Sequence, residues 1–363
     1  MERRTFIVKA GGVLVAAGAA AVVEAPNVIA QQRFQWRMAT SWTPALDVLQ
    51  GSAQRFAKIV DEVSSGRLKI QVFAAGELIP ALGVFDACSQ GTIECYHSTS
   101  YYFAGKEPGF QWFSTVPFGM NSQLALAWHN HGDGLKLWEE TYKPFSMIPR
   151  PGGPVGVQTA GWFRKKINTI ADLKGLKMRI PGLGGKVLAK TGVTVVLLPP
   201  GEIYAALERG VVDAAEWVAP HDDMKLGLHR AARYYYTPGW HEPGTFTEFV
   251  FNAKAYDSLP GELQRTLDYA AAATQPLMLA EYDWKNSLAF EKLRTEFKGK
   301  VEVLLLPASV MKDLKKLSAE VIKEESEKSP MAKKVYDSYT KFQSSMEDYV
   351  RISEGAYHRL MVG

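Results

Sequence analysis

The chain has 363 residues, of which 47% are hydrophobic and 22% are charged, and its formal net charge is +4 at pH 7. These values are typical of an ordinary folded protein. The small positive charge gives no reason to expect nucleic acid or a membrane surface as the partner. A chain of this length usually forms two domains.

The first thirty residues have the pattern of an export signal. The pair Arg3-Arg4 is followed by Phe6, and the stretch 10–23 is apolar and uncharged. This stretch is shorter than the roughly 20 residues that a membrane-spanning helix needs, so a retained membrane anchor is the weaker interpretation. We therefore expect residues 1–30 to be a twin-arginine signal peptide and the mature protein to reach the periplasm.

From residue 34 the chain alternates short apolar runs with segments of helical periodicity. The expected elements are strands over 34–40, 68–73 and 92–96 and helices over 45–63 and 81–90. This alternation predicts a parallel sheet with helices on its faces. A further helix is expected over 124–142, and residues 31–150 are assigned to this first α/β lobe.

The segment 143–154 contains four prolines and two glycines, and we expect it to carry the chain toward a second lobe. The alternation then returns, which assigns residues 151–258 to a second α/β lobe. Its expected elements are strands over 155–163, 177–180, 193–198, 212–218, 234–238 and 247–252 and helices over 185–190 and 203–208.

The last third of the chain is predicted to be almost wholly helical. Residues 259–328 are expected to form helices that cross back over both lobes, and 329–363 a separate C-terminal helix. That last helix carries an apolar stripe with steps of four and three, formed by Val335, Tyr339, Phe342, Met346 and Tyr349. The stripe is compatible with packing on its own domain and with packing on a second subunit.

Two expected strands end in side chains of opposite charge, Arg179 and Glu216. An arginine can bind a carboxylate through two parallel hydrogen bonds. A neighbouring glutamate would repel the same anion unless a cation lay between them. The two strand ends therefore suggest a small organic acid that is bound together with a metal ion.

Other motifs carry less information. The glycine-rich segment 181–186 fails as a nucleotide-binding loop, because Ile180 and Val187 stand where such a loop needs glycine and serine or threonine. Its glycines more simply allow another group to come close to the backbone N–H groups at the start of a helix. The cluster His221-Asp222-Asp223 is compatible with a metal site and, better, with the start of a helix.

The sequence shows no convincing set of catalytic residues. Neither a nucleophile elbow nor a zinc-protease motif is present, and His129 and His131 would lie on different faces of a helix. Cys88 and Cys95 are compatible with a disulfide and with two buried thiols. We expect a protein that is not an enzyme.

Several stretches of the chain are characteristic of one transport family. They are 56–58, 65–68, 75–78, 172–179 and, above all, 200–216, which reads PGEIYAALERGVVDAAE. With them the chain resembles, over essentially all of residues 34–350, the periplasmic solute-binding subunits of TRAP transporters, the ion-driven uptake systems for organic acids. The resemblance implies a two-lobed periplasmic-binding-protein fold with a hinge, a helical C-terminal extension and a TRAP membrane permease as partner.

A finer resemblance is to the branch that binds 2-oxo acids and lactate together with a sodium or calcium ion. The matching segments are 158–163, 179–182, 216–220, 234–236 and 239–240. The resemblance implies a small monocarboxylic ligand such as pyruvate or a longer 2-oxo acid. Lactate or another 2-hydroxy acid is the alternative, and sodium against calcium is left open.

The same resemblance implies roles for individual residues. Arg179 would bind the carboxylate, and Tyr101 or Tyr102 would touch the ligand from the first lobe. The cation would be held by the side chains of Gln158 and Glu216 and by the backbone carbonyl of Trp217, with Glu242 as a further candidate. His241 and Pro243 depart from what the resemblance leads us to expect beside Trp240.

In this branch the last helix can be exchanged between the protomers of a dimer, so the resemblance also implies a homodimer through residues 330–349. Two other functions remain compatible with the residues: a metal-dependent enzyme acting on 2-oxo acids, and a binding protein of an ATP-driven importer. An enzyme would need a general base near the ligand, and the sequence shows none.

Overall fold

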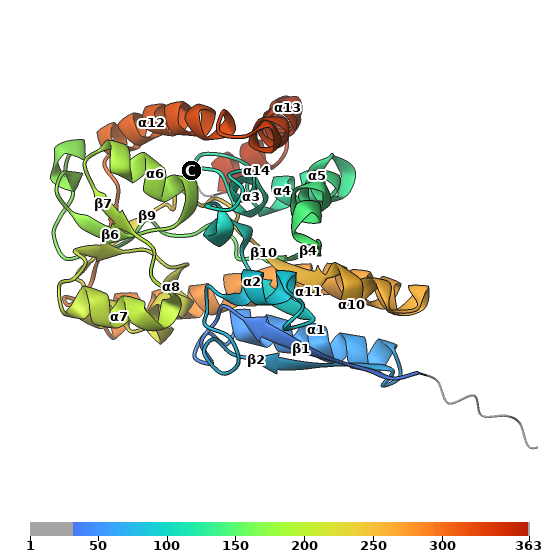
Figure 1. The fold of residues 1–363 in the computed structure, drawn as a ribbon. Coiled ribbons are helices and arrows are strands. Elements are labelled where there is room, and N and C mark those ends of the chain that lie inside the picture. Colours follow the sequence, from blue (N-terminus) through green and yellow to red (C-terminus); the bar gives the residue numbers. More distant parts are fainter. Residues whose placement is uncertain (1–31, 362–363) are drawn as a thin grey trace, which may run out of the picture. The chain divides into compact units, whose positions relative to one another are not determined.

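Alternating apolar residues place β1 (Phe34–Thr40) in the interior of the first of two β-sheets (Figure 1). The computed structural model describes residues 32–361, so the expected signal peptide lies outside the described residues. β1 pairs in parallel with β2 (Leu68–Phe73) on one side and β3 (Cys95–Ser98) on the other. The parallel arrangement of these three strands was predicted.

The other two strands of this sheet differ from the expected organisation. β10 (Phe246–Asn252) runs antiparallel to both β3 and β4 (Met147–Pro154), and the strand order is β2-β1-β3-β10-β4. Residues 147–154 are thus a strand and not a linker, and β10 joins the first sheet although it was expected in the second lobe. β4 tolerates its prolines because it is an edge strand with a single partner.

The second sheet has the order β11-β9-β5-β8-β6-β7. β6 is parallel to β7 and β8, and β5 is antiparallel to β8 and β9. Its strands are β5 (Gly161–Phe163), β6 (Lys177–Arg179), β7 (Thr194–Val196), β8 (Ala214–Ala215), β9 (Tyr234–Thr237) and β11 (Glu302–Leu305). The strand expected over 155–163 is shorter, because residues 155–160 run between the two sheets before β5 begins.

Helices cover the faces of both sheets. In the first half of the chain they are α1 (Leu49–Val63), α2 (Val84–Ser89), α3 (Phe110–Ser114), α4 (Ser122–His131), α5 (Gly134–Tyr142), α6 (Gly182–Lys190) and α7 (Pro200–Glu208). In the second half they are α8 (Pro220–Lys225), α9 (Leu228–Ala231), α10 (Ala253–Asp257), α11 (Gly261–Thr295), α12 (Ala308–Ser326), α13 (Pro330–Ile352) and α14 (Glu354–Met361). Three short 3₁₀ turns lie at Ser100–Phe103, Lys143–Phe145 and Ile170–Leu173.

The single helix expected over 124–142 is two helices. α4 ends at His131, with Gly132 as its C-cap, and α5 starts at Gly134. A side chain at Gly134 would place its Cβ only 2.9 Å from the His129 Cα atom, so glycine allows α5 to fold back closely onto α4.

The core follows the two faces of each sheet. Neighbouring residues of one strand enter different apolar clusters: Phe249 and Val250 lie on opposite faces of the first sheet, as Tyr235 and Tyr236 do on the second. The two cysteines are buried free thiols. No helix within residues 32–361 combines the length and the apolar character that crossing a membrane requires.

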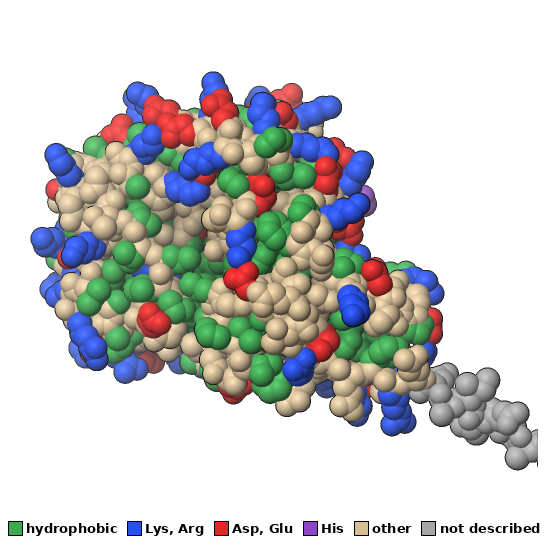
Figure 2. Space-filling model, viewed as in Figure 1, with side chains coloured by type: hydrophobic (Ala, Val, Ile, Leu, Met, Phe, Trp, Pro, Cys, Tyr) green, Lys and Arg blue, Asp and Glu red, His purple; other side chains and the backbone are tan. Residues whose placement is uncertain are grey.

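The C-terminal helices connect the parts of the chain. α11 is 35 residues long and packs on β4, α1 and α8. α12 lies along α6, and α13 packs against α3, α4 and α5 (Figure 1). On the face shown in Figure 2, acidic and basic side chains are intermixed along the edge that carries α12.

The apolar stripe of α13 divides into two parts. Val335 and Tyr339 are buried in the core of their own chain, and the Tyr339 hydroxyl accepts a hydrogen bond from the Met120 backbone N–H at 2.7 Å. Tyr349, by contrast, is 63% exposed. The first half of the stripe thus packs on its own chain, which the periodicity alone left open.

Candidate ligand-binding site

The predicted site residues emerge at one edge of the second sheet. Arg179 ends β6 and Glu216 follows β8, and these strands are parallel, so both chain ends point the same way. β5 runs antiparallel to β8 and β9, which brings Gln158, before β5, to the same edge as Glu242, after β9. The strand directions therefore gather the four side chains that the sequence singled out.

Arg179 is the centre of this group and is only 1% exposed. Its Nη1 donates to the Glu216 backbone carbonyl at 2.5 Å and lies 3.2 Å from Glu216 Oε2, and its Nε donates to the Leu198 carbonyl at 3.3 Å. The guanidinium carbon lies 5.0 Å from the centre of the Trp217 ring. These contacts hold the guanidinium in place and leave Nη2 as its least engaged nitrogen.

Gln158, Glu242 and Thr245 form a buried hydrogen-bonded set. Gln158 Nε2 and Thr245 Oγ1 both donate to Glu242 Oε2, each at 2.6 Å. The amide oxygen of Gln158, Oε1, is buried and has no hydrogen-bond partner among the described residues. Sequence reasoning missed Thr245, whose only local signal is its position three residues after Glu242.

A second unpaired oxygen lies beside His241. Glu216 Oε1 is buried without a partner in the described part of the chain, and the same is true of both ring nitrogens of His241. His241 Nε2 is 3.7 Å from Glu216 Oε1, which is too long for a hydrogen bond. One ligand atom each from Glu216, His241 and Glu242 lie within 4.8 Å of one another, so the three side chains converge on one small volume.

Burial dominates the protonation of these groups. It raises the pKa of Glu216 to about 8 in spite of the opposing charge of Arg179, and it raises the pKa of Glu242 to about 8, with a further increase from Glu216. Burial also lowers the pKa of His241 to about 4, so the imidazole is neutral at pH 7. A cation next to the unpaired Glu216 Oε1 and Gln158 Oε1 would oppose this effect of burial and favour the ionised carboxylates.

Elements next to the first sheet close over this group. The Tyr102 hydroxyl lies 3.4 Å from Arg179 Nη2, and the Tyr101 ring lies against Gly182, where an added Cβ would be 3.5 Å away. Trp42, which follows β1, meets the Trp217 ring edge-on at 6.2 Å between centres. Both tyrosines singled out by the sequence therefore face the buried group, and Gly182 allows the close approach expected of the glycine-rich segment.

The cluster His221-Asp222-Asp223 lies outside this group. His221 Nε2 lies 2.7 Å from Asp47 Oδ1, and Asp47 also accepts a hydrogen bond from Lys285. Asp223 accepts hydrogen bonds from the Val218 N–H, the Trp162 indole and the Tyr235 hydroxyl at 2.8–3.1 Å. The two aspartates lie in the first turn of α8, as expected, and Asp223 anchors the segment that follows Glu216.

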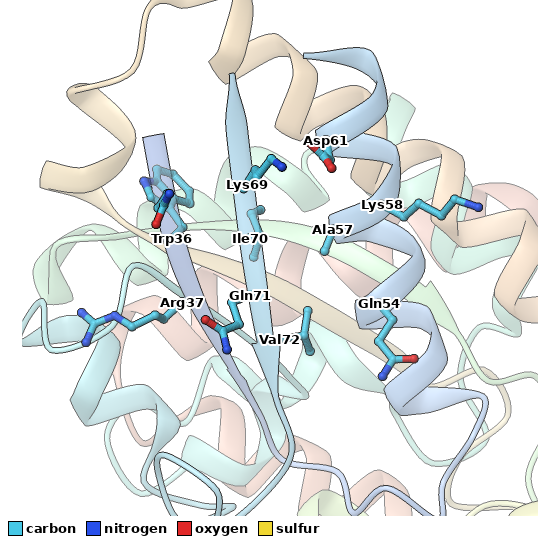
Figure 3. A pocket seen from close by; sticks show the side chains of 11 residues that line it. Trp36, Arg37, Gln54, Ala57, Lys58, Asp61, Lys69, Ile70, Gln71 and Val72 are labelled. Atoms are coloured by element: carbon cyan, nitrogen blue, oxygen red, sulfur yellow. The ribbon is translucent and has the colours of Figure 1, made fainter. Parts of the chain in front are cut away.

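A groove on the first sheet lies outside the group around Arg179. It lies over β1, β2 and α1, and Figure 3 shows long polar side chains such as Arg37, Lys58 and Gln71 spread along it. None of the predicted site residues lines it, so it does not compete with the group around Arg179 as the candidate site.

Comparison with known proteins identifies the family. Residues 38–329 match the family of bacterial extracellular solute-binding proteins, family 7. The chain belongs to this family. It is 43% identical, over 92% of its length and 88% of the relative's, to a monocarboxylate 2-oxoacid-binding periplasmic protein of a Nostoc species.

Two solved structures of solute-binding proteins are similar to this family 7 protein in sequence and fold. A TRAP transporter solute-binding protein of Bordetella bronchiseptica is 40% identical, with a TM-score of 0.88 over 91% of this chain and 98% of that one. It is a mixed-occupancy dimer with copurified calcium and picolinate bound at its active site. A TRAP solute-binding protein of Pseudoalteromonas atlantica, bound to sodium and pyruvate, is 39% identical, with a TM-score of 0.87 over 90% and 99%. The predicted α/β periplasmic-binding-protein fold is thus confirmed.

Proposed function

We propose that the protein captures a small monocarboxylic 2-oxo acid, such as pyruvate, together with a cation, and delivers it to the membrane permease of a TRAP transporter. The observation that carries this proposal is the set of unpaired buried oxygens, Gln158 Oε1 and Glu216 Oε1, beside the buried guanidinium of Arg179. Unpaired buried polar atoms are costly, so a ligand that pairs them stabilises the bound form.

Each side chain has a role in this proposal. Arg179 would hold the carboxylate through Nη2, and Tyr101 and Tyr102 would contact the acid from the first-sheet side. Gln158, Glu216, Glu242 and the backbone carbonyl of Trp217 would hold the cation. When bound, the cation supplies the positive charge that a 2-oxo acid can chelate through its carboxylate and its neighbouring oxygen.

The proposal includes domain closure around a hinge, without chemical conversion of the acid. The contacts of Tyr102 with Arg179 and of Trp42 with Trp217 join elements of the two sheets directly over the site. Loss of these contacts would open the site to solvent, and their formation would enclose the acid. The lobes would be those assigned from the sequence, with β10 placed in the first.

Two further parts of the proposal concern assembly and export. The exposed apolar residues at the end of α13 and in α14 support a homodimer through the C-terminal helix; they are Tyr349, Ile352, Tyr357, Leu360 and Met361. The arginine pair Arg3-Arg4 before an apolar stretch supports export by the twin-arginine route. Replacement of both arginines with lysine should then leave unprocessed precursor in the cytoplasm, whereas a Lys9→Arg variant should be exported normally.

Calorimetric titration of the purified protein tests the central proposal. The ligands are pyruvate, 2-oxobutyrate, 2-oxovalerate, lactate and, as a control without a second chelating oxygen, acetate, each with sodium, calcium or a chelator. We expect 2-oxo acids to bind only when a cation is present and acetate to bind weakly or not at all. Binding of a 2-oxo acid that is indifferent to every cation would contradict the cation site, and pyruvate consumption followed by NMR would reveal an enzyme.

A further inference from the structure

The segment 41–48 joins the two sides of the molecule next to the site. It follows β1 and precedes α1, so by chain order it belongs to the first-sheet side. Its apolar residues nevertheless pack toward the second sheet, because Trp42 and Leu46 enter the same apolar cluster as Trp217. The position of this segment therefore decides whether the Trp42 ring stays on the Trp217 ring.

Asp47 is the one charged residue of this segment, and both oxygens of its carboxylate have partners on other elements. His221 Nε2, on α8, lies 2.7 Å from Oδ1, and Lys285 Nζ, on α11, donates to Oδ2 at 2.9 Å. The side chain of Asp47 is 38% exposed, and those of His221 and Lys285 are mostly buried. Water and salt therefore screen these contacts less than they screen an ordinary surface ion pair.

The two donors belong to elements that are tied to each other. α8 packs on α11 (Figure 1), and the His221 backbone N–H donates to Asn286 Oδ1 at 3.0 Å. The Tyr282 hydroxyl, also on α11, donates to Asp222 Oδ2 on α8 at 2.7 Å. Because α8 and this part of α11 are held together, Asp47 meets both donors at once or neither.

Further charges extend this contact along α11. Lys285 Nζ also donates to Glu281 Oε1 at 2.6 Å, and the other Glu281 oxygen accepts from Arg55 on α1. Burial by itself would raise the pKa of Asp47, but the hydrogen bonds from Lys285 and His221 outweigh it and lower this pKa to about 2. The carboxylate is thus ionised at neutral pH and makes charge-assisted hydrogen bonds.

We propose that Asp47 is a positioning residue that keeps the site closed while an acid is bound. By holding α8 and α11 together, its carboxylate fixes the segment 41–48 and hence the Trp42 ring on Trp217. It acts through these rings and not on the acid itself. The inference rests on the proposed function, which it deepens by naming the contact that delays reopening.

The contacts of Asp47 should act on release more than on capture. An acid can enter only while the two sides are apart, so these contacts form after entry and must break before release. Loss of a contact that forms late speeds dissociation and leaves the association rate nearly unchanged. Two charge-assisted hydrogen bonds are at stake, so we expect release to become roughly ten- to a hundredfold faster.

The test measures pyruvate release from purified protein that has been loaded with pyruvate and either calcium or sodium. Rapid mixing with excess lactate dehydrogenase and NADH traps the released pyruvate, and calorimetry gives the dissociation constant, so the ratio of the two gives the capture rate. Asp47→Ala should release pyruvate roughly ten- to a hundredfold faster than the parent, with a capture rate within about threefold.

Two further variants show whether the effect belongs to this contact. His221→Ala removes only the α8 half and should speed release less, and adding it to Asp47→Ala should cause no further change, because both act on one interaction. Arg67→Ala is the matched control: it removes an ion pair of 3.0 Å to Glu262, which joins the first-sheet side to the start of α11 but not to α8. It should release pyruvate like the parent.

Two outcomes of the kinetics overturn the proposal. One is release from Asp47→Ala within about twofold of the parent rate. The other is a capture rate that falls as much as the release rate rises, because general damage to the site would do this and a contact that forms after entry would not.

Hydrogen exchange, followed by mass spectrometry without any acid, separates this proposal from the proposed function. If the parent binds neither pyruvate nor another 2-oxo acid with either cation, the proposed function is refuted and exchange decides about Asp47. Faster exchange over 41–48 and 217–225 in Asp47→Ala, but not in Arg67→Ala, would then support the contact as the one that holds these segments together. Unchanged exchange in both segments would overturn it.

Discussion

Arg179 engages Glu216 through only one of the two carboxylate oxygens. Its Nη1 lies 3.2 Å from Oε2, whereas Oε1 is turned toward His241 and has no partner in the described chain. Glu216 therefore links the side of the site that suits an anion to the side that suits a cation. The sequence suggested that a cation would separate arginine and glutamate. In the fold, Glu216 contacts Arg179 through Oε2, and its Oε1 faces the position proposed for the cation.

The first prediction concerns Arg179. Replacement with alanine should remove nearly all measurable binding of 2-oxo acids, a loss of roughly 3–5 kcal/mol, because an enclosed carboxylate would lose its charged partner. Calorimetry with pyruvate and cation measures this. Arg233→Ala, which removes a surface arginine paired with Glu302, should bind like the parent. An Arg179→Ala protein that still binds within tenfold of the parent would refute the assignment.

The second prediction concerns Asp223, which holds the segment after Glu216 in place. Asp223 accepts three buried hydrogen bonds, including one from the Val218 N–H that holds the segment after Glu216. Asp223→Asn cannot accept all three, so we expect a loss of about 1–3 kcal/mol in unfolding free energy and weaker pyruvate binding. Asp222→Asn is the matched control, because Asp222 is equally buried and accepts the Tyr282 hydroxyl but not the Val218 N–H. Equal effects of the two variants in urea titrations would argue against a positioning role.

The third prediction concerns pH and a buried carboxyl outside the group around Arg179. Burial raises the pKa of Glu248 from its ordinary value of 4.5 to about 7, although Tyr142, Tyr96 and Trp138 donate to it. The folded state thus holds this proton more tightly than the unfolded state. The associated stability is full below the ordinary pKa and is lost as the pH rises through about 7.

Glu248→Gln should therefore flatten the pH profile of stability. Between pH 5 and pH 8, the parent should lose up to about 3 kcal/mol of unfolding free energy relative to the variant. Denaturant titrations at several pH values give this difference directly. Parallel pH profiles for the two proteins would show that Glu248 does not titrate in this range.

The fourth prediction concerns assembly. Ile352 is 75% exposed and Leu360 is 85% exposed, whereas Tyr339 in the same C-terminal region is buried in its own chain. The double variant Ile352→Glu and Leu360→Glu should convert a dimer into a monomer, because charges would be buried at the interface. Light scattering after size exclusion measures the mass. Val63→Glu, at another exposed apolar position, should leave it unchanged, and a double variant that is still dimeric would exclude this interface.

Truncation is a poorer test of the same idea. A chain that stops near Lys328 would lack Val335 and Tyr339, which belong to the core of the first sheet's helices. Such a chain would expose apolar surface whether or not the protein forms a dimer. Substitution at the exposed end of the helices separates association from folding.

Local patterns in the sequence were enough to predict most helices and strands and the charged groups at strand ends. The apolar run that ends in Arg179 and the one that leads to Glu216 predicted two strands, a bound acid and a cation, because periodicity and side-chain charge are local properties. The helix expected over 45–63 ends at Val63, and Ser65 and Gly66 just after it have positive φ. The family resemblance added Gln158, Glu242 and the tyrosines.

Which of these residues meet depends on long-range contacts of the folded chain. The proline-rich strand β4 forms because β10 returns to the first sheet as its neighbour, a long-range pairing that no local pattern encodes. His241 and Thr245 join the site because β9 runs antiparallel to β5 and because glycine at 184 lets α6 approach. Whether a polar atom such as Glu216 Oε1 is left unpaired depends on every group packed around it, and that sum of distant contacts exists only in the folded chain.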